Sequence, residues 1–236
     1  MSETSLPDGY SAGTIRPEDE YHPPDWIVWL RKHIWKIGIV AALVFVTSMH
    51  FLLQRRPEAP PVLTELPAVQ LIDQTGVTFG PEQMRGKVWV VGFVFTRCGS
   101  TCPAVSQAML HFQDSFVKSS RMEEQVHMLT VTVDPEFDRP EVLAAYAEKL
   151  GADLDSWTFV TGTQADIEHF VVDGFKLAVG ERTEEAPGVF DIAHSTKLAL
   201  VDRFGKVRFY TDTDPESLNE AYHRLFPILR AEADTP

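Results

Sequence analysis

The hydrophobic pattern of the chain is densest near its N-terminal end. From Ile37 to Leu53 no residue is fully charged, and this is close to the minimum apolar length that crosses a bilayer. Tryptophan rings, which favour the membrane interface, precede this stretch at Trp26, Trp29 and Trp35. An apolar face all round the helix argues against a buried core helix. We therefore predict a single transmembrane helix at residues 34–54.

The segments on either side of this helix are polar. The first residues are rich in Pro, Gly, Ser and acids without any period, and they predict a disordered tail over residues 1–33. Four prolines after the helix predict an extended spacer over residues 55–67. We expect residues 68–232 to form one domain.

Within that domain, apolar strand patterns alternate with amphipathic helix patterns. Val88–Phe95 is a continuous apolar run, as expected of a strand buried on both faces. The next expected element is a helix at Pro103–Val117 with one apolar face. We also expect strands at 126–133, 157–160, 197–202 and 206–210, helices at 139–150, 164–172 and 215–229, and a hairpin with arms 175–179 and 189–192. This order predicts an α/β, thioredoxin-like sandwich with a central mixed sheet and flanking helices.

The net charge of −13 comes entirely from the part of the chain after the membrane helix. Residues 57–236 hold 28 acidic and 15 basic residues. Such a surface repels phosphate backbones and argues against a nucleic-acid partner. It suits a basic protein partner or a bound cation.

The chain has two cysteines, too few for a disulfide scaffold, so the pair needs another explanation. Cys98 and Cys102 stand where the first long strand meets its helix, and this end of a strand is the usual place for a site. The helix dipole and the positive charge of Arg97 both favour a thiolate there. Pro103 fits the first helical turn. The position predicts a reactive thiol pair.

The spacing of the two cysteines leaves metal binding and disulfide formation open. If both were helical, their Cβ atoms would lie about 5–6 Å apart, whereas a disulfide requires about 3.5–4.5 Å. A metal ion between two thiolates tolerates the wider gap. If Cys98 lies in the loop, both states are reachable. Two thiolates suit the soft ion Cu(I), while Cu(II) prefers an added nitrogen or oxygen donor.

His194 is our candidate for the third ligand. It follows the strand expected at 189–192 and precedes the one at 197–202, so we expect it on a loop at a sheet edge. The other histidines of the domain fall in or beside predicted helices and strands, where surface histidines are commonplace: His111, His127, His169 and His223.

Three local motifs resemble the Sco (SenC) family of membrane-anchored copper-binding proteins. Phe95–Pro103 contains a CxxxCP pattern at the strand–helix junction. Thr132–Glu141 is similar to the DPxxDxP stretch before the second helix of that family, and His194-Ser195 is similar to its histidine segment. Their order is more specific than CxxxC alone. The resemblance spans roughly residues 62–230, with the membrane helix upstream as the family arrangement implies.

The resemblance implies Cys98 and Cys102 as thiolate ligands of copper, Cu(I) or Cu(II), and His194 as the third ligand. It also implies copper delivery to, or thiol reduction of, the binuclear copper site of cytochrome c oxidase. The chain departs from the family pattern at Gly99-Ser100, and at Ala193, where the family commonly has Asp. A carboxylate near a ligating imidazole helps to orient it, so copper affinity or the partner could differ.

Asp134 and Asp138 have structural interpretations. We expect Asp134 to cap a turn before Pro135, with a contact to the metal centre as the alternative, and Asp138 to cap the helix that begins at Arg139-Pro140.

Three functions are compatible with these residues. The first is a copper metallochaperone, a binding protein without turnover. The second is a thiol–disulfide oxidoreductase acting on an extracytoplasmic client, although such an enzyme more usually has CxxC and does not need His194. The third is a peroxidase-like reaction of Cys98 beside Thr96 and Arg97.

The basic residues around the membrane helix predict its orientation. Three precede the span and two follow it: Arg31, Lys32 and Lys36, then Arg55 and Arg56. By the positive-inside rule this favours a cytoplasmic N-terminus. We expect a single-pass protein of the bacterial inner (plasma) membrane with its C-terminal domain in the periplasm or otherwise outside the cytoplasm.

Overall fold

The computed structural model describes residues 23–53, 58–98, 102–120, 122–186 and 189–231. The chain divides into two compact units, residues 1–55 and residues 56–236, and each is described by itself. The expected tail falls largely on residues 1–22, which lie outside the described part.

The first unit contains the helix α1 (Asp25–Leu53). By length and composition it is able to cross a membrane, and it is the one such helix in the described part of the chain. Residues 25–33, predicted above as part of the polar tail, are helical. Their apolar side chains continue the pattern of the span, and Asp25 places a negative charge in the first turn, where the helix dipole favours it.

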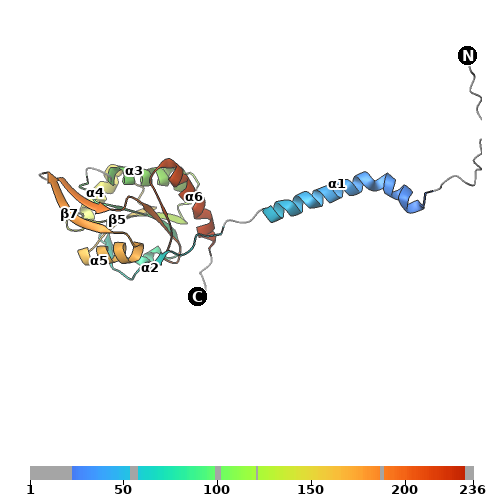
Figure 1. The fold of residues 1–236 in the computed structure, drawn as a ribbon. Coiled ribbons are helices and arrows are strands. Elements are labelled where there is room, and N and C mark those ends of the chain that lie inside the picture. Colours follow the sequence, from blue (N-terminus) through green and yellow to red (C-terminus); the bar gives the residue numbers. More distant parts are fainter. Residues whose placement is uncertain (1–22, 54–57, 99–101, 121, 187–188, 232–236) are drawn as a thin grey trace, which may run out of the picture. The chain divides into compact units, whose positions relative to one another are not determined.

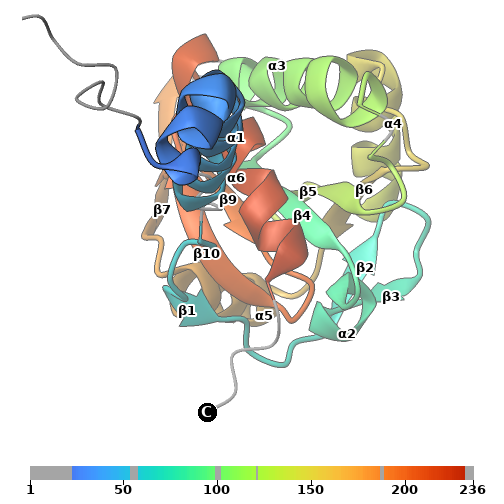
Figure 2. The same cartoon turned by 90° about the vertical axis from the view of Figure 1, so that its right-hand side faces the viewer.

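The second unit is built on a mixed sheet with helices on both faces, as the sequence predicts (Figures 1 and 2). Within the described residues this sheet has eight strands in the order β1-β10-β9-β4-β5-β6-β2-β3. Their bounds are β1 (Thr64–Glu65), β2 (Leu71–Asp73), β3 (Thr78–Phe79), β4 (Val88–Val94), β5 (Val126–Thr132), β6 (Trp157–Thr161), β9 (Leu198–Val201) and β10 (Lys206–Thr211).

The centre of the sheet is parallel and its margins are antiparallel. β4, β5 and β6 run parallel to one another, while β9 pairs antiparallel with β4 and β2 pairs antiparallel with β6. All seven residues of β4 are buried, which explains its continuous apolar sequence. The carboxyl ends of the three parallel strands therefore share one end of the sheet.

The helices cover the two faces of the sheet. α3 and α4 run along one face and α5 along the other (Figures 1 and 2). The helical elements are α2 (Pro81–Met84), α3 (Cys102–Phe112), η2 (Gln113–Lys118), α4 (Pro140–Leu150), α5 (Gln164–Glu168), η3 (His169–Gly174) and α6 (Pro215–Arg230), of which η2 and η3 are π-helical. α3 lies so close to β4 that a Cβ at Gly92 would approach Met109 Sδ to 2.3 Å.

The first strand of the sheet lies in the segment expected to be a spacer. Thr64 pairs with Val207, and upstream of it the carbonyl of Pro60 accepts a hydrogen bond from Arg208 Nη1 at 3.1 Å. The sheet therefore begins before residue 68. Proline content indicates an extended chain, but it does not indicate whether another strand will pair with it.

A separate two-stranded hairpin is formed by β7 (Val179–Ala186) and β8 (Val189–His194). Its first arm begins where the predicted arm 175–179 ends. Phe175 is fully buried in edge contacts with Phe93 and Phe170, at ring-centroid distances of 5.0 and 5.3 Å. Packing of that ring in the core takes residue 175 out of the hairpin.

Candidate metal centre

Cys98 and Cys102 lie where the chain passes from β4 into α3, as the sequence predicts. Phe95 follows the strand, and its carbonyl accepts the backbone N–H of Cys98 at 3.2 Å. α3 begins at Cys102. Residues 99–101 lie outside the described part. Cys98 is 9% exposed and Cys102 is 1% exposed, so both sulfurs belong to a largely dry site.

Both cysteines are thiols in this structure, and they lie together. The backbone N–H of Cys102 points to Cys98 Sγ at 3.4 Å, and a donor aimed at a sulfur stabilises negative charge on it. Cys98 precedes the helix, so the helical spacing considered above does not apply to the pair. Metal binding and disulfide formation are both compatible with this placement.

Cys102 is the more protected of the two sulfurs. Burial raises the pKa of its thiol above the ordinary range, and the hydrogen bond with Cys98 raises this pKa further. A backbone hydrogen bond with Phe95 acts in the opposite direction. A metal ion that binds Cys102 must therefore displace a firmly held proton.

Arg97 forms an ion pair with Asp134, so its positive charge has a different role from the one that its sequence position suggests. Its Nη2 lies 2.6 Å from Asp134 Oδ2, and its guanidinium stacks on the ring of Phe137 at 4.1 Å. The side chain of Asp134 is 3% exposed and that of Arg97 is 22% exposed, so the carboxylate of the pair is largely removed from water. Because Asp134 offsets this charge, Arg97 supports the thiolates less than its place before Cys98 predicts.

Asp138 does not cap α4. The residue before that helix is Arg139, which makes no side-chain cap. The carboxylate of Asp138 turns inward instead and accepts hydrogen bonds from Thr96 N at 3.0 Å, from Thr96 Oγ1, and from Thr132 Oγ1 at 2.6 Å. Burial raises the pKa of this carboxyl group even though these hydrogen bonds lower it.

Asp134 and Asp138 together hold the loop that leads to Cys98 against the end of β5. Thr132 belongs to this network and was not predicted from the sequence. A partial signal exists, since Thr132 ends β5 and Thr96 follows the end of the adjacent parallel strand β4 by two residues. The DPxxDxP stretch thus supports the cysteine loop.

His194 is the last residue of β8 and pairs with Val179, so it ends a strand where a loop was expected. Its side chain lies outside the described part. The chain that follows it enters β9, which is antiparallel to β4, with Val91 paired to Ala199. It therefore enters β9 at the end of the sheet from which the cysteine loop leaves β4.

The other histidines of the domain lie in the elements predicted for them and contact other groups. His127 Nε2 lies 2.7 Å from Lys87 Nζ, and His169 Nδ1 lies 2.8 Å from Asp173. His111 is close to Ser115, and His223 is exposed on α6. Among the side chains that the structure describes, no group of three His, Cys, Asp or Glu is arranged to hold a metal ion.

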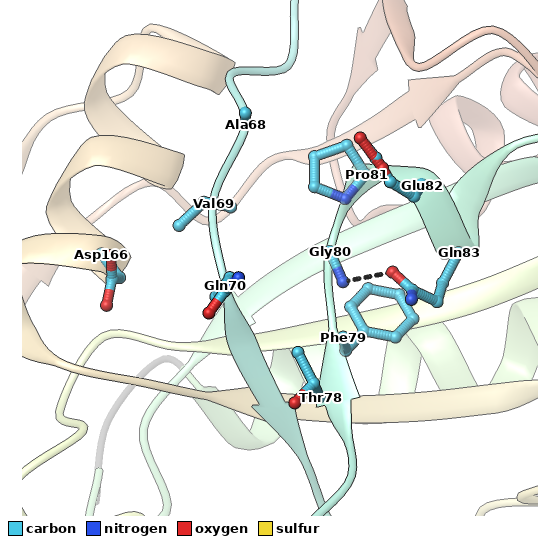
Figure 3. A pocket seen from close by; sticks show the side chains of 10 residues that line it. All are labelled: Ala68, Val69, Gln70, Thr78, Phe79, Gly80, Pro81, Glu82, Gln83 and Asp166. Carbon is cyan, nitrogen blue, oxygen red and sulfur yellow. Dashed lines mark hydrogen bonds between the residues drawn. The ribbon is translucent and has the colours of Figure 1, made fainter.

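A cavity larger than the one that Cys98 borders lies elsewhere in the domain (Figure 3). It has a volume of about 570 Å³ between the segment around Val69, the β3–α2 junction and Asp166 of α5. Neither cysteine nor histidine lines it, and the backbone N–H of Gly80 within it is already bonded to Gln83 Oε1 at 2.8 Å. The size of this cavity alone does not indicate a ligand or a reaction.

Comparison with known proteins relates this arrangement to other chains. The SCO1/SenC family model matches residues 64–226. A SCO1 protein homolog from Bacillus subtilis (strain 168) is 32% identical over 136 residues, which are 57% of this chain and 67% of the relative.

Solved structures show the same fold. BsSco, described as a member of the Sco family of cytochrome c oxidase assembly proteins with a disulfide switch, has a TM-score of 0.63 at 24% identity, covering 75% of this chain and all of its own. Bradyrhizobium japonicum ScoI with copper bound has a TM-score of 0.59 at 21% identity, covering 70% of this chain and 99% of its own. With the family model matching well over half of its residues, the chain belongs to the SCO1/SenC family.

Proposed function

We propose that this chain is a metallochaperone that binds copper through Cys98, Cys102 and His194 and delivers it to the binuclear copper site of cytochrome c oxidase. One observation carries the proposal. The two thiols lie together at the start of α3, with the N–H of Cys102 directed at Cys98 Sγ. Such a pair offers a soft ion two sulfur donors in a largely water-free place.

The residues present fit copper as a cargo. Two thiolates are sufficient for Cu(I), and an imidazole from His194 would supply the harder donor that Cu(II) prefers. Asp138 and the Arg97–Asp134 pair keep the cysteine loop in place before the ion arrives. Support also comes from the family, since a copper-bound structure exists for ScoI of Bradyrhizobium japonicum.

Copper titration of the reduced protein tests this proposal. We expect equimolar Cu(I) binding in the wild type and a loss of it in Cys98→Ser. His194→Ala should abolish the wild-type Cu(II) spectrum, whereas His223→Ala, which removes an exposed histidine of α6, should leave it unchanged. A reduced wild type that binds no copper would refute the proposal. An unaltered Cu(II) spectrum in His194→Ala would refute the three-ligand site.

A thiol–disulfide oxidoreductase is the second candidate, because Cys98 lies outside the helix and next to Cys102. BsSco, a member of the same family, is described with a disulfide switch. This function predicts catalysed reduction of a disulfide in an oxidase-derived peptide, lost in both Cys98→Ser and Cys102→Ser but retained in His194→Ala. Retention of the reduction without either cysteine would exclude it.

We further propose that α1 anchors the protein in the inner membrane with the N-terminus in the cytoplasm and the copper site outside. The helix is long and apolar enough to span, and the larger number of basic residues precedes it. In this orientation the cysteines lie in the compartment where we expect the copper-site subunit of the oxidase.

A further inference from the structure

A cavity of about 250 Å³ opens beside Cys98, between the first turns of α3 and the last turn of α4. The residues that matter for its chemistry are Cys98, Ser106, Gln107, Tyr146, Lys149 and Leu150. Cys102 is not among the residues that line it. Of the two cysteines, Cys98 is therefore the one that borders the cavity.

The polar groups of this cavity differ in whether they have hydrogen-bond partners. Ser106 Oγ and Tyr146 OH lie 2.7 Å apart and bond to each other. Gln107 and Lys149 are exposed, and neither side chain makes a hydrogen bond or ion pair with any residue that the structure describes. An amide and an ammonium group are therefore available at the rim, while Cys98 forms part of the wall.

The charge at this rim is opposite to that of the whole chain. The net charge is −13, yet the described residues that line the cavity include Lys149 and no Asp or Glu. A ligand that reaches Cys98 through this cavity meets a positive charge. A carboxylate on that ligand, a few ångströms from its sulfur, would be complementary to Lys149 and could also accept from the Gln107 amide.

We propose that this cavity receives the group next to the reacting sulfur of a disulfide substrate, and that Lys149 selects disulfides carrying a carboxylate there. The proposal rests on the assignment of Cys98 as a reactive thiol in the proposed function. Lys149 is a specificity residue, and the substrate is either a disulfide in a client protein whose cysteine has an acidic neighbour or a small disulfide that carries a carboxylate.

The corresponding exchange step has a simple balance. The thiolate of Cys98 attacks one sulfur of a disulfide R–S–S–R and forms a new S–S bond to that half. The old S–S bond breaks, and the other half leaves as a thiolate with the electron pair. Cys98 is oxidised and the departing half is reduced, with no further reactant.

Exchange rates with charged disulfides test the proposal. The full chain in detergent, carrying Cys102→Ser so that the mixed disulfide accumulates, is treated with 3,3′-dithiodipropionate or cystamine. The ratio of the two rate constants, anionic over cationic, should fall by about two- to fivefold in Lys149→Gln, the range expected for one exposed charge. Lys149→Arg should keep the ratio. Lys176→Gln, which removes an exposed lysine outside the cavity, should keep it too.

A ratio that is unchanged in Lys149→Gln, or that changes equally in Lys176→Gln, would overturn the proposal. A terminally blocked Cys-Glu peptide disulfide represents the client protein, and glutathione disulfide represents the small molecule. Lys149→Gln should slow exchange with the disulfide that the cavity accepts. Cu(I) titration of the same variants with Cys102 restored separates the two proposals. Absence of copper binding in every variant, wild type included, would refute copper delivery and leave the exchange result standing.

Discussion

The carboxylate of Asp138 connects the end of β5 with the loop that follows β4. It is fully buried, and its hydrogen bonds come from Thr96, which precedes Cys98 by two residues, and from Thr132 at the end of β5. A buried carboxylate is tolerated only where donors compensate for its lost hydration. The three donors here are therefore what allows a charge-bearing group to sit under the cysteine loop.

Asp138→Asn should destabilise the domain by about 1–3 kcal/mol, because an amide leaves at least one buried donor unsatisfied. Urea unfolding of a fragment of residues 56–236, which is a compact unit with its own core, measures the change. Asp155→Asn, at an exposed position, is the control and should have little effect. Equal stability of the two variants would show that the Asp138 network does not stabilise the fold.

The sequence could not predict the role of Asp138, although it singled out the residue. Helix capping is a local rule, and a carboxylate just before Arg139-Pro140 satisfies it. The donors that decide the outcome include Thr96, 42 residues away in sequence. Arg97 shows the same limit, because its charge near Cys98 is visible in the sequence whereas its pairing with Asp134 depends on the fold.

His127 makes the stability of the domain depend on pH. Burial lowers the pKa of its imidazole below the ordinary value of 6.5, and the adjacent Lys87 ammonium lowers it further. The folded state therefore resists protonation more than the unfolded state does. The contribution of the neutral ring is present above pH 6.5 and is lost as the pH falls through the lower folded pKa.

We expect His127→Gln to lower the free energy of unfolding of the fragment at pH 7.5. At pH 5, the difference in this free energy between the variant and the wild type should be smaller. Urea unfolding at the two pH values gives that difference. His223→Gln, on the exposed face of α6, serves as the matched histidine control. If the wild type and His127→Gln lose the same stability between the two pH values, His127 is not the titrating group.

At the scale of elements, the central strands and the longer helices were predictable. β4 is a continuous apolar run. α4 ends at Gly151, whose φ of 78° lies in the left-handed region that favours glycine. The short strands β2 and β3 were not predicted. Two or three residues are too few to show a period. These strands form through pairing with their neighbours, since β6 pairs with β2 and β2 pairs with β3.

Strand β10 fixes the beginning of the domain through a buried ion pair. Arg208 Nε lies 2.7 Å from Asp202 Oδ2, with side-chain exposures of 3% and 0%, and the same guanidinium reaches the carbonyl of Pro60. On the same strand Lys206 makes a pair with Glu65, which is 70% exposed. The Arg208–Asp202 pair is therefore desolvated, whereas the Lys206–Glu65 pair remains hydrated.

Arg208→Ala should cost about 3–5 kcal/mol, because it leaves the Asp202 carboxylate buried without its cation. Lys206→Ala should cost less than about 1 kcal/mol, since water replaces the lost partner. Equilibrium unfolding of the two variants of the fragment tests the contrast. Similar losses for both would mean that burial of the Arg208–Asp202 pair does not determine its contribution.

At the scale of the whole molecule, the distribution of charge differs between the segment that contains α1 and the domain. Basic and acidic residues balance before residue 57, and the acidic excess lies entirely after it. Acidic residues contribute little to membrane topology, whereas Lys and Arg close to a span determine it. We therefore expect the proposed orientation of α1 to depend on a few basic residues near it and not on the charge of the domain.

Neutralising the basic residues before the apolar core should change that orientation. With Arg31, Lys32 and Lys36 replaced by Gln, Arg55 and Arg56 become the dominant positive charges, and part of the population should insert with the C-terminus in the cytoplasm. Alkaline phosphatase fused after Pro236, which is active only outside the cytoplasm, should lose activity. Replacing Arg55 and Arg56 by Gln is the control and should leave activity unchanged. Full activity in the triple variant would show that these residues do not orient α1.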